Sequence, residues 1–158
     1  MRSTLRNFAF IAVVAGSPGV LADSSTDPGF GSWKLNEHKS TFRPGPAPKG
    51  LTTTFEAAGT GVKWVSRRIG PDGSVMVAEY TGHYDGKDYP VTGSPTTDSV
   101  TLRRIDARTT ERVNKKDGKV VSTERREVAP DGRSYTTTVT GTTAKGEPIN
   151  TRMVFDRQ

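Results

Sequence analysis

Residues 115–139 read KKDGKVVSTERREVAPDGRSYTTTV. Two Asp-Gly dipeptides, Asp117-Gly118 and Asp131-Gly132, bracket a run rich in Val, Thr and alternating charge. Asp-Gly is favoured in tight hairpin turns because their central residues need positive φ, which glycine adopts freely and aspartate tolerates. Asp72-Gly73 and Asp85-Gly86 repeat the signal earlier in the chain. The stretch therefore predicts a succession of β-hairpins.

The same spacing, followed through the chain, predicts an all-β fold. We expect a single antiparallel up-and-down meander of about ten strands, with no helical period of useful length. Closure into a barrel removes the exposed sheet edges, so a barrel is the first expectation, and a β-sandwich or a curled open sheet is the alternative. The predicted strands lie at about 30–36, 51–57, 62–70, 74–84, 87–92, 98–105, 108–116, 119–129, 133–143 and 148–156.

The N-terminus carries the pattern of an export signal. Arg2 and Arg6 precede a short apolar stretch at 8–14, and Val20-Leu21-Ala22 places small residues before a cleavage point. The apolar stretch is much shorter than a membrane-spanning helix, so we expect no transmembrane segment after cleavage, and a periplasmic or secreted protein. The predicted organisation is a signal peptide at 1–22, a flexible linker at 23–29 and a β-barrel domain at 30–158.

Composition argues against several classes of function. The net charge is +6, but charges of both signs alternate along the strands, and an exported protein is not expected to have nucleic acid as its partner. The chain has no cysteine, and its two histidines, His38 and His83, lack metal-ligand spacing. We therefore predict no catalytic residues, no metal, no cofactor and no enzymatic activity.

One short motif resembles a known family. Gly31-Ser32-Trp33 matches the Gly-x-Trp of lipocalins and fatty-acid-binding proteins, which together are calycins, and the ten-strand count resembles the fatty-acid-binding branch. The resemblance implies a lipocalin-like barrel in which Trp33 is structural and Arg152 or Arg157 of the last strand packs over it. The chain departs from that branch in having a Pro-rich loop at 42–48 instead of a helical lid, and in lacking its carboxylate-binding Arg-x-Tyr.

A second resemblance covers nearly the whole mature chain. Residues 31–158 are similar to a group of exported bacterial proteins with no known activity. These share a Gly-x-Trp-Lys-Leu-Asn opening, a Pro-Gly-Pro-Ala-Pro-Lys loop, and the segment that here runs from Tyr84 to Gly93. This resemblance implies export but no particular function.

Three pairs of adjacent arginines are the main clue to a site: Arg67-Arg68, Arg103-Arg104 and Arg125-Arg126. Adjacent strand residues point to opposite faces, so one guanidinium of each pair is expected to face the interior. An isolated buried cation is costly, so the interior must be wet, hold acidic partners or receive an anion. Snorkelling of the long side chains to water at the barrel mouths is the alternative.

The apolar face of each strand indicates which arginine faces inward. Val62 and Trp64 place Arg68 inward, Val100 and Leu102 place Arg104 inward, and Val120 and Val128 place Arg126 inward, with Glu124 on the same face. The predicted ligand-contacting residues are Trp64, Arg68, Tyr80, Arg104, Arg126, Tyr135 and Met153.

Two functions remain open from the sequence. The first is a carrier that binds a small amphipathic molecule, hydrophobic or anionic, inside the barrel. The second is a non-catalytic envelope interaction or structural protein whose barrel is filled with side chains. In a meander, alternate turns share one end, so a portal is expected where the Pro-rich loop, the 71–73 turn and the 93–95 turn meet. The sequence does not indicate the oligomeric state.

Overall fold

The computed structural model describes residues 27–158. The predicted signal peptide and residues 23–26 of the predicted linker lie outside these residues. Within the described part there is no helix long and apolar enough to cross a membrane. The strands are β1 (Gly31–Thr41), β2 (Gly50–Ala58), β3 (Gly61–Ile69), β4 (Val75–Gly82), β5 (Asp85–Pro90), β6 (Ser99–Arg104), β7 (Thr109–Lys116), β8 (Lys119–Val128), β9 (Ser134–Thr142) and β10 (Pro148–Arg157).

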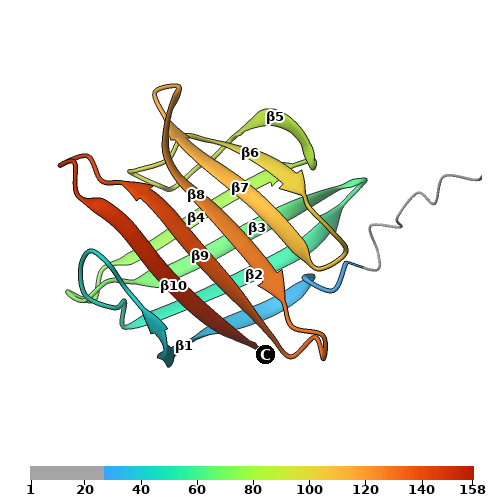
Figure 1. Ribbon diagram of the computed structural model, residues 1–158, viewed down its shortest axis with the longest axis horizontal. Coiled ribbons are helices and arrows are strands. Elements are labelled where there is room, and N and C mark those ends of the chain that lie inside the picture. Colours follow the sequence, from blue (N-terminus) through green and yellow to red (C-terminus); the bar gives the residue numbers. More distant parts are fainter. Residues whose placement is uncertain (1–26) are drawn as a thin grey trace, which may run out of the picture.

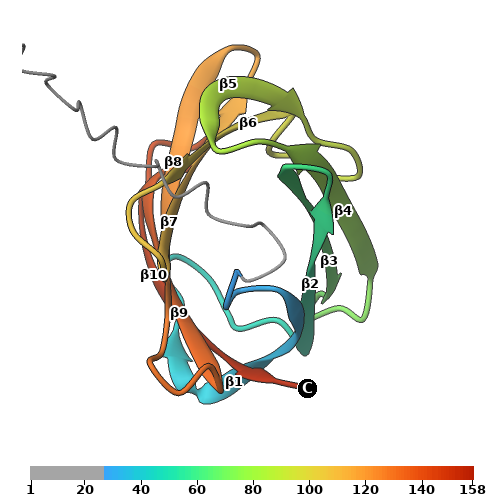
Figure 2. The same ribbon diagram turned by 90° about the vertical axis from the view of Figure 1, so that its right-hand side faces the viewer.

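The ten strands form one antiparallel sheet in the order β4-β3-β2-β1-β10-β9-β8-β7-β6-β5 (Figure 1). Every neighbouring pair is consecutive in the chain except β1 and β10, which bring the first and last strands together. The predicted all-β meander of ten strands is therefore confirmed, with strand ends close to the expected positions. Figure 2 shows the strands curling around a common interior.

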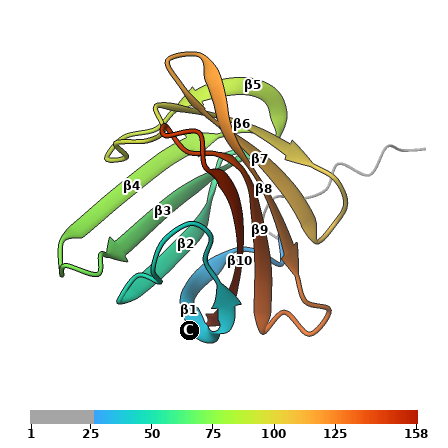
Figure 3. The ribbon, with the colours of Figure 1, turned by 60° about the vertical axis from the view of Figure 1, so that its left-hand side comes forward.

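The barrel is nearly closed, and the remaining seam lies between β4 and β5. In the part of the chain that the structure describes, a single isolated bridge joins the two sides there, between Glu79 and Thr92. Away from this bridge, β4 and β5 diverge (Figure 2 and Figure 3). A seam bridged at one point leaves the edges of β4 and β5 mostly without strand partners, whereas each of the other neighbouring pairs forms a ladder.

The first strand is longer than expected, because β1 continues past Asn36 to Thr41. Its pairing with β10 is irregular between Asn36 and Thr41, where the register shifts. The polar residues in this part show no apolar alternation, which is why the sequence pattern ended the strand early. The Pro-rich connection at 42–49 follows and is not helical.

The core centres on Trp33, which is fully buried. Its ring meets the edge of Tyr135 with centroids 4.8 Å apart, and Tyr135 stacks on Phe155 at 4.6 Å. The Tyr135 hydroxyl shares a hydrogen bond of 2.6 Å with the Thr53 hydroxyl. Trp33 is therefore structural, as predicted, and ties β1 to β2, β9 and β10.

Arg157 packs over the indole of Trp33, with its guanidinium carbon 4.1 Å from the ring centroid. The same guanidinium donates to the carbonyls of Pro28 (2.7 Å), Phe30 (2.8 Å) and Gly132 (2.7 Å). A Cβ at Gly31 would lie 2.6 Å from Nη1 of Arg157, so glycine leaves room for the guanidinium. Of the two arginines expected to pack over Trp33, it is Arg157 that does so.

We predict that Arg157→Met lowers the free energy of unfolding by about 2 kcal/mol, because three carbonyls lose a charged donor and the indole loses its cation. Urea unfolding at neutral pH measures the change. Arg133→Met is the matched control, since Arg133 is exposed and its side chain forms no hydrogen bond or ion pair within residues 27–158; we expect a loss of less than about 0.5 kcal/mol there. Equal losses in the two variants would contradict the role assigned to Arg157.

Candidate functional site

Two adjoining cavities occupy the barrel interior, with volumes of about 180 and 210 Å³. The first extends toward the end of the barrel that holds Trp33, and the second lies beneath the β5–β6 connection near the seam. Side chains from β3, β4, β7 and β8 line both. The shared residues are Trp64, Ser66, Arg68, Tyr80, Arg112 and Glu124. The two cavities are therefore neighbouring compartments of one interior.

The structure brings together six of the seven residues expected to contact a ligand. The first cavity is lined by Trp64, Arg68, Tyr80, Arg126, Tyr135 and Met153. The seventh, Arg104, does not line either cavity. It lies at the N-terminal end of the barrel, defined here by residues 27–30 and Trp33, where its guanidinium covers the ring of Tyr84 at 4.4 Å and pairs with Asp27.

Aromatic and aliphatic side chains form one wall of this interior. Trp64 and Tyr80 stack with centroids 5.1 Å apart across β3 and β4, where the register places them opposite each other. Phe55 and Phe155 add apolar surface on β2 and β10. Such a wall favours the hydrocarbon part of a ligand.

A half-buried ion pair lies halfway along the interior. Arg112 donates to Glu124 at 2.6 Å, and Asn114 donates to the same carboxylate oxygen at 2.8 Å. The Arg112 guanidinium also lies 4.4 Å from the centroid of Trp64. Burial alone would lower the pKa of Arg112, but the charge and hydrogen bond of Glu124, together with the interactions with Tyr80, outweigh burial and the pKa is raised. Arg112 is therefore a neutralised cation.

Arg126 differs from Arg112 because no carboxylate pairs with it among residues 27–158. The residue is only 6% exposed. Its Nε donates to the Thr110 hydroxyl at 3.2 Å, and its guanidinium carbon lies 3.9 Å from the Phe55 centroid. Nη1 is buried and has no hydrogen-bond partner. The first cavity therefore has a buried, unneutralised positive charge in its wall.

The buried tyrosines of the site are suited to donate hydrogen bonds and not to ionise. Burial raises the pKa of Tyr80, despite the nearby charge of Arg112. Burial likewise raises the pKa of Tyr135. Within residues 27–158 there is no group of three or more histidine or acidic side chains placed to hold a metal ion. The chemistry of the interior is that of binding by cations, hydroxyls and aromatic faces.

Sequence reasoning missed Arg112, Asn114 and Tyr84 as interior residues. On β7 the inward positions are Thr110, Arg112 and Asn114, so no apolar residue marks that face of the strand. The useful signal was on the partner strand, because Glu124 was expected to face inward and lies opposite Arg112 in the register. An inward carboxylate predicts a nearby cation. Which residue supplies that cation is known only once the register of β7 and β8 is known.

Comparisons with known proteins support the fold and go no further. No family model and no curated protein sequence matches the chain. Among solved structures, the zebrafish ileal bile acid-binding protein, crystallised with cholic acid, is similar with a TM-score of 0.51 and 13% identity. The match covers 83% of this chain and 99% of that chain. The chain therefore has a calycin-like fold, as the Gly-x-Trp motif indicated.

We predict that Glu124→Gln lowers the free energy of unfolding by about 2 kcal/mol, because it leaves the half-buried Arg112 charge without its partner. Urea unfolding measures this. The double variant Arg112→Met with Glu124→Leu removes both charges and is expected to lose less than the single variant. A double variant less stable than Glu124→Gln would show that the pair itself, and not the orphaned charge, sets the stability.

Proposed function

We propose that this chain is an exported carrier that binds one small amphipathic anion inside the barrel. The anionic group contacts Arg126 and the hydrocarbon part lies against Trp64, Tyr80 and Met153. The calycin-like fold, which the zebrafish bile acid-binding protein shares, supports binding of a small ligand in the barrel.

The single observation that carries the proposal is the buried guanidinium of Arg126. A cation taken out of water costs several kcal/mol unless a partner neutralises it, and Arg126 has none among the described residues. It lines a cavity, so a ligand in that cavity can supply the missing charge. Carboxylates, sulfonates and phosphates suit a guanidinium because their oxygens match its paired donors.

The cavities weigh against the side-chain-filled barrel that was the alternative function. Each volume is below the range of about 300–1,000 Å³ typical of ligand pockets, but the two compartments adjoin and share six lining residues. A ligand extending from Arg126 toward Arg68 would use both. In this proposal the apolar part of the ligand lies in the middle of the barrel, near the neutralised Arg112.

We predict that Arg126→Met weakens binding of dodecanoate about tenfold or more, because the charged hydrogen bond to the carboxylate is lost. Isothermal titration or displacement of a fluorescent probe measures the affinity. Dodecanol has the same chain without the charge, and its weaker binding is expected to change less than twofold. Stability is expected to hold or rise, because the substitution removes an unpaired buried charge.

Arg103→Met is the matched control for this experiment. Arg103 is a strand arginine with the same charge, but it is exposed on the outer face of β6. Its removal is expected to leave dodecanoate affinity within twofold. An equal effect of the two substitutions would show that net charge, and not a site at Arg126, attracts the anion.

Native mass spectrometry of the gently purified protein tests both export and occupancy. Cleavage after Ala22 gives the mass of residues 23–158, and a bound ligand adds a discrete mass that is released on denaturation. A full-length mass would contradict cleavage. A clean mass that does not change when dodecanoate is added would contradict the carrier function.

A further inference from the structure

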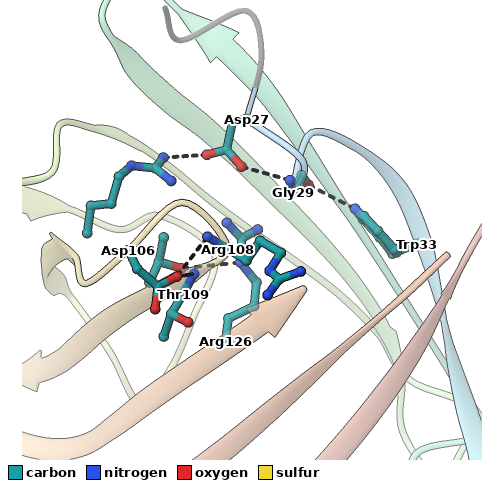
Figure 4. Close-up of polar contacts among 9 residues, drawn as sticks. Asp27, Gly29, Trp33, Asp106, Arg108, Thr109 and Arg126 are labelled. Atoms are coloured by element: carbon teal, nitrogen blue, oxygen red, sulfur yellow. Dashed lines mark hydrogen bonds and ion pairs between the residues drawn. The ribbon is translucent and has the colours of Figure 1, made fainter. Parts of the chain in front are cut away.

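Residues 27–30 form a short strap that crosses the N-terminal end of the barrel, over the end of the first cavity. Arg157 holds the carbonyls of Pro28 and Phe30, and the Trp33 indole nitrogen donates to the Gly29 carbonyl at 3.0 Å. Figure 4 shows the hydrogen bond of Trp33 to Gly29 and that of Gly29 to Asp27, together with Arg126. The strap is thus fixed from one side by Trp33 and Arg157, which together with Tyr135 and Phe155 are called the Trp33 cluster.

Asp27 fixes the strap from the other side. Its carboxylate pairs with Nη2 of Arg104 on β6 and also accepts the Gly29 amide at 2.7 Å. The side chain of Asp27 is only 4% exposed, whereas that of Arg104 is 31% exposed. A carboxylate is therefore buried at the end of the barrel, and its position depends on a cation that comes from β6.

The strap also touches the unneutralised arginine of the proposed site. A Cβ at Gly29 would lie 2.7 Å from Nη2 of Arg126, so the backbone passes directly against the guanidinium. Tyr84 links the two arginines, because it lines the cavity and lies under Arg104. Burial raises the pKa of Tyr84, the charges of Arg126 and Arg104 lower it and that of Asp27 raises it, so all three charged groups act on one phenol.

The groups around Tyr84 are thus two guanidiniums, of Arg104 and Arg126, and one carboxylate, of Asp27. The carboxylate belongs to the chain itself and comes from a segment with no place in the sheet. We propose that Asp27 is a built-in competitor of the anionic ligand: its carboxylate occupies the Arg104 side of an anion site that extends to Arg126 through Tyr84, and an incoming anion displaces the strap. This inference rests on the proposed function and adds to it a means of regulation.

The displacement has a definite energetic consequence. If the strap must leave before the anion reaches both arginines, the apparent affinity is reduced by the fraction of molecules with the strap open. Weakening the strap then tightens binding, whereas weakening Arg126 loosens it. The ligand class follows from the same arrangement: a group with two or more anionic oxygens, such as a carboxylate or sulfonate, suits the guanidinium of Arg104, which Asp27 now holds, and that of Arg126, which no carboxylate among residues 27–158 holds.

We predict that Asp27→Asn binds dodecanoate about fivefold more tightly than the unmodified protein, with dodecanol unchanged. Asp131→Asn is the matched control, because it removes the same charge from the exposed β8–β9 turn at the same end of the barrel. We expect less than a twofold change there, so a larger effect at Asp27 separates local competition from net charge.

Hydrogen exchange in the unmodified protein gives a second measurement that does not depend on any variant folding. The amides of Gly29 and Phe30 are bonded within the strap, to the Asp27 carboxylate and the Asp27 carbonyl. Saturation with dodecanoate is expected to speed their exchange. Unchanged or slower exchange, or unchanged or weaker binding by Asp27→Asn, overturns the inference. If Arg126→Met also leaves the affinity unchanged, the proposed function fails as well; if it weakens binding, only the competitor role fails.

Discussion

The pairing of the first strand with the last is the constraint on which the rest of the barrel depends. β1 and β10 join a four-stranded N-terminal half to a six-stranded C-terminal half, and no other ladder within residues 27–158 connects the halves. The Trp33 cluster lies at this junction, and Arg157 binds both the strap before β1 and the turn before β9. The interior cavities exist because this junction holds the two halves in a curved arrangement around them.

The two interior arginines differ in whether a carboxylate neutralises them. Arg112 is compensated by Glu124 and Asn114 in the middle of the barrel, and it presents its guanidinium to aromatic rings. Arg126 relies on a hydroxyl and on the faces of aromatic rings, which stabilise a cation only weakly compared with a carboxylate. This difference, and not the number of arginines, distinguishes a structural cation from one available to a ligand.

Local signals in the sequence predicted the strands well, because Asp-Gly turns and Val- and Thr-rich runs act over a few residues. Alternation from Val128 correctly placed Arg126 inward, but Val120, expected on the same face, is 62% exposed. A register shift between Asn114 and Lys115 separates the hairpin end from the rest of the ladder, and residue types alone do not reveal it. Contacts such as Asp27 with Arg104, distant in the chain, likewise depend on how the barrel closes.

The seam between β4 and β5 gives the barrel a preferred direction of breathing. Among residues 27–158, the backbone hydrogen bonds across it are the two between Glu79 and Thr92, of 3.1 and 3.0 Å. At a net worth of about 1 kcal/mol each, these two bonds contribute about 2 kcal/mol to holding the seam, beside the packing of Tyr89 against Gly82. Every other pair of neighbouring strands would have to break a whole ladder. The seam is therefore the line along which the fewest backbone bonds resist opening, and it lies beside the compartment lined by Met76 and Val91.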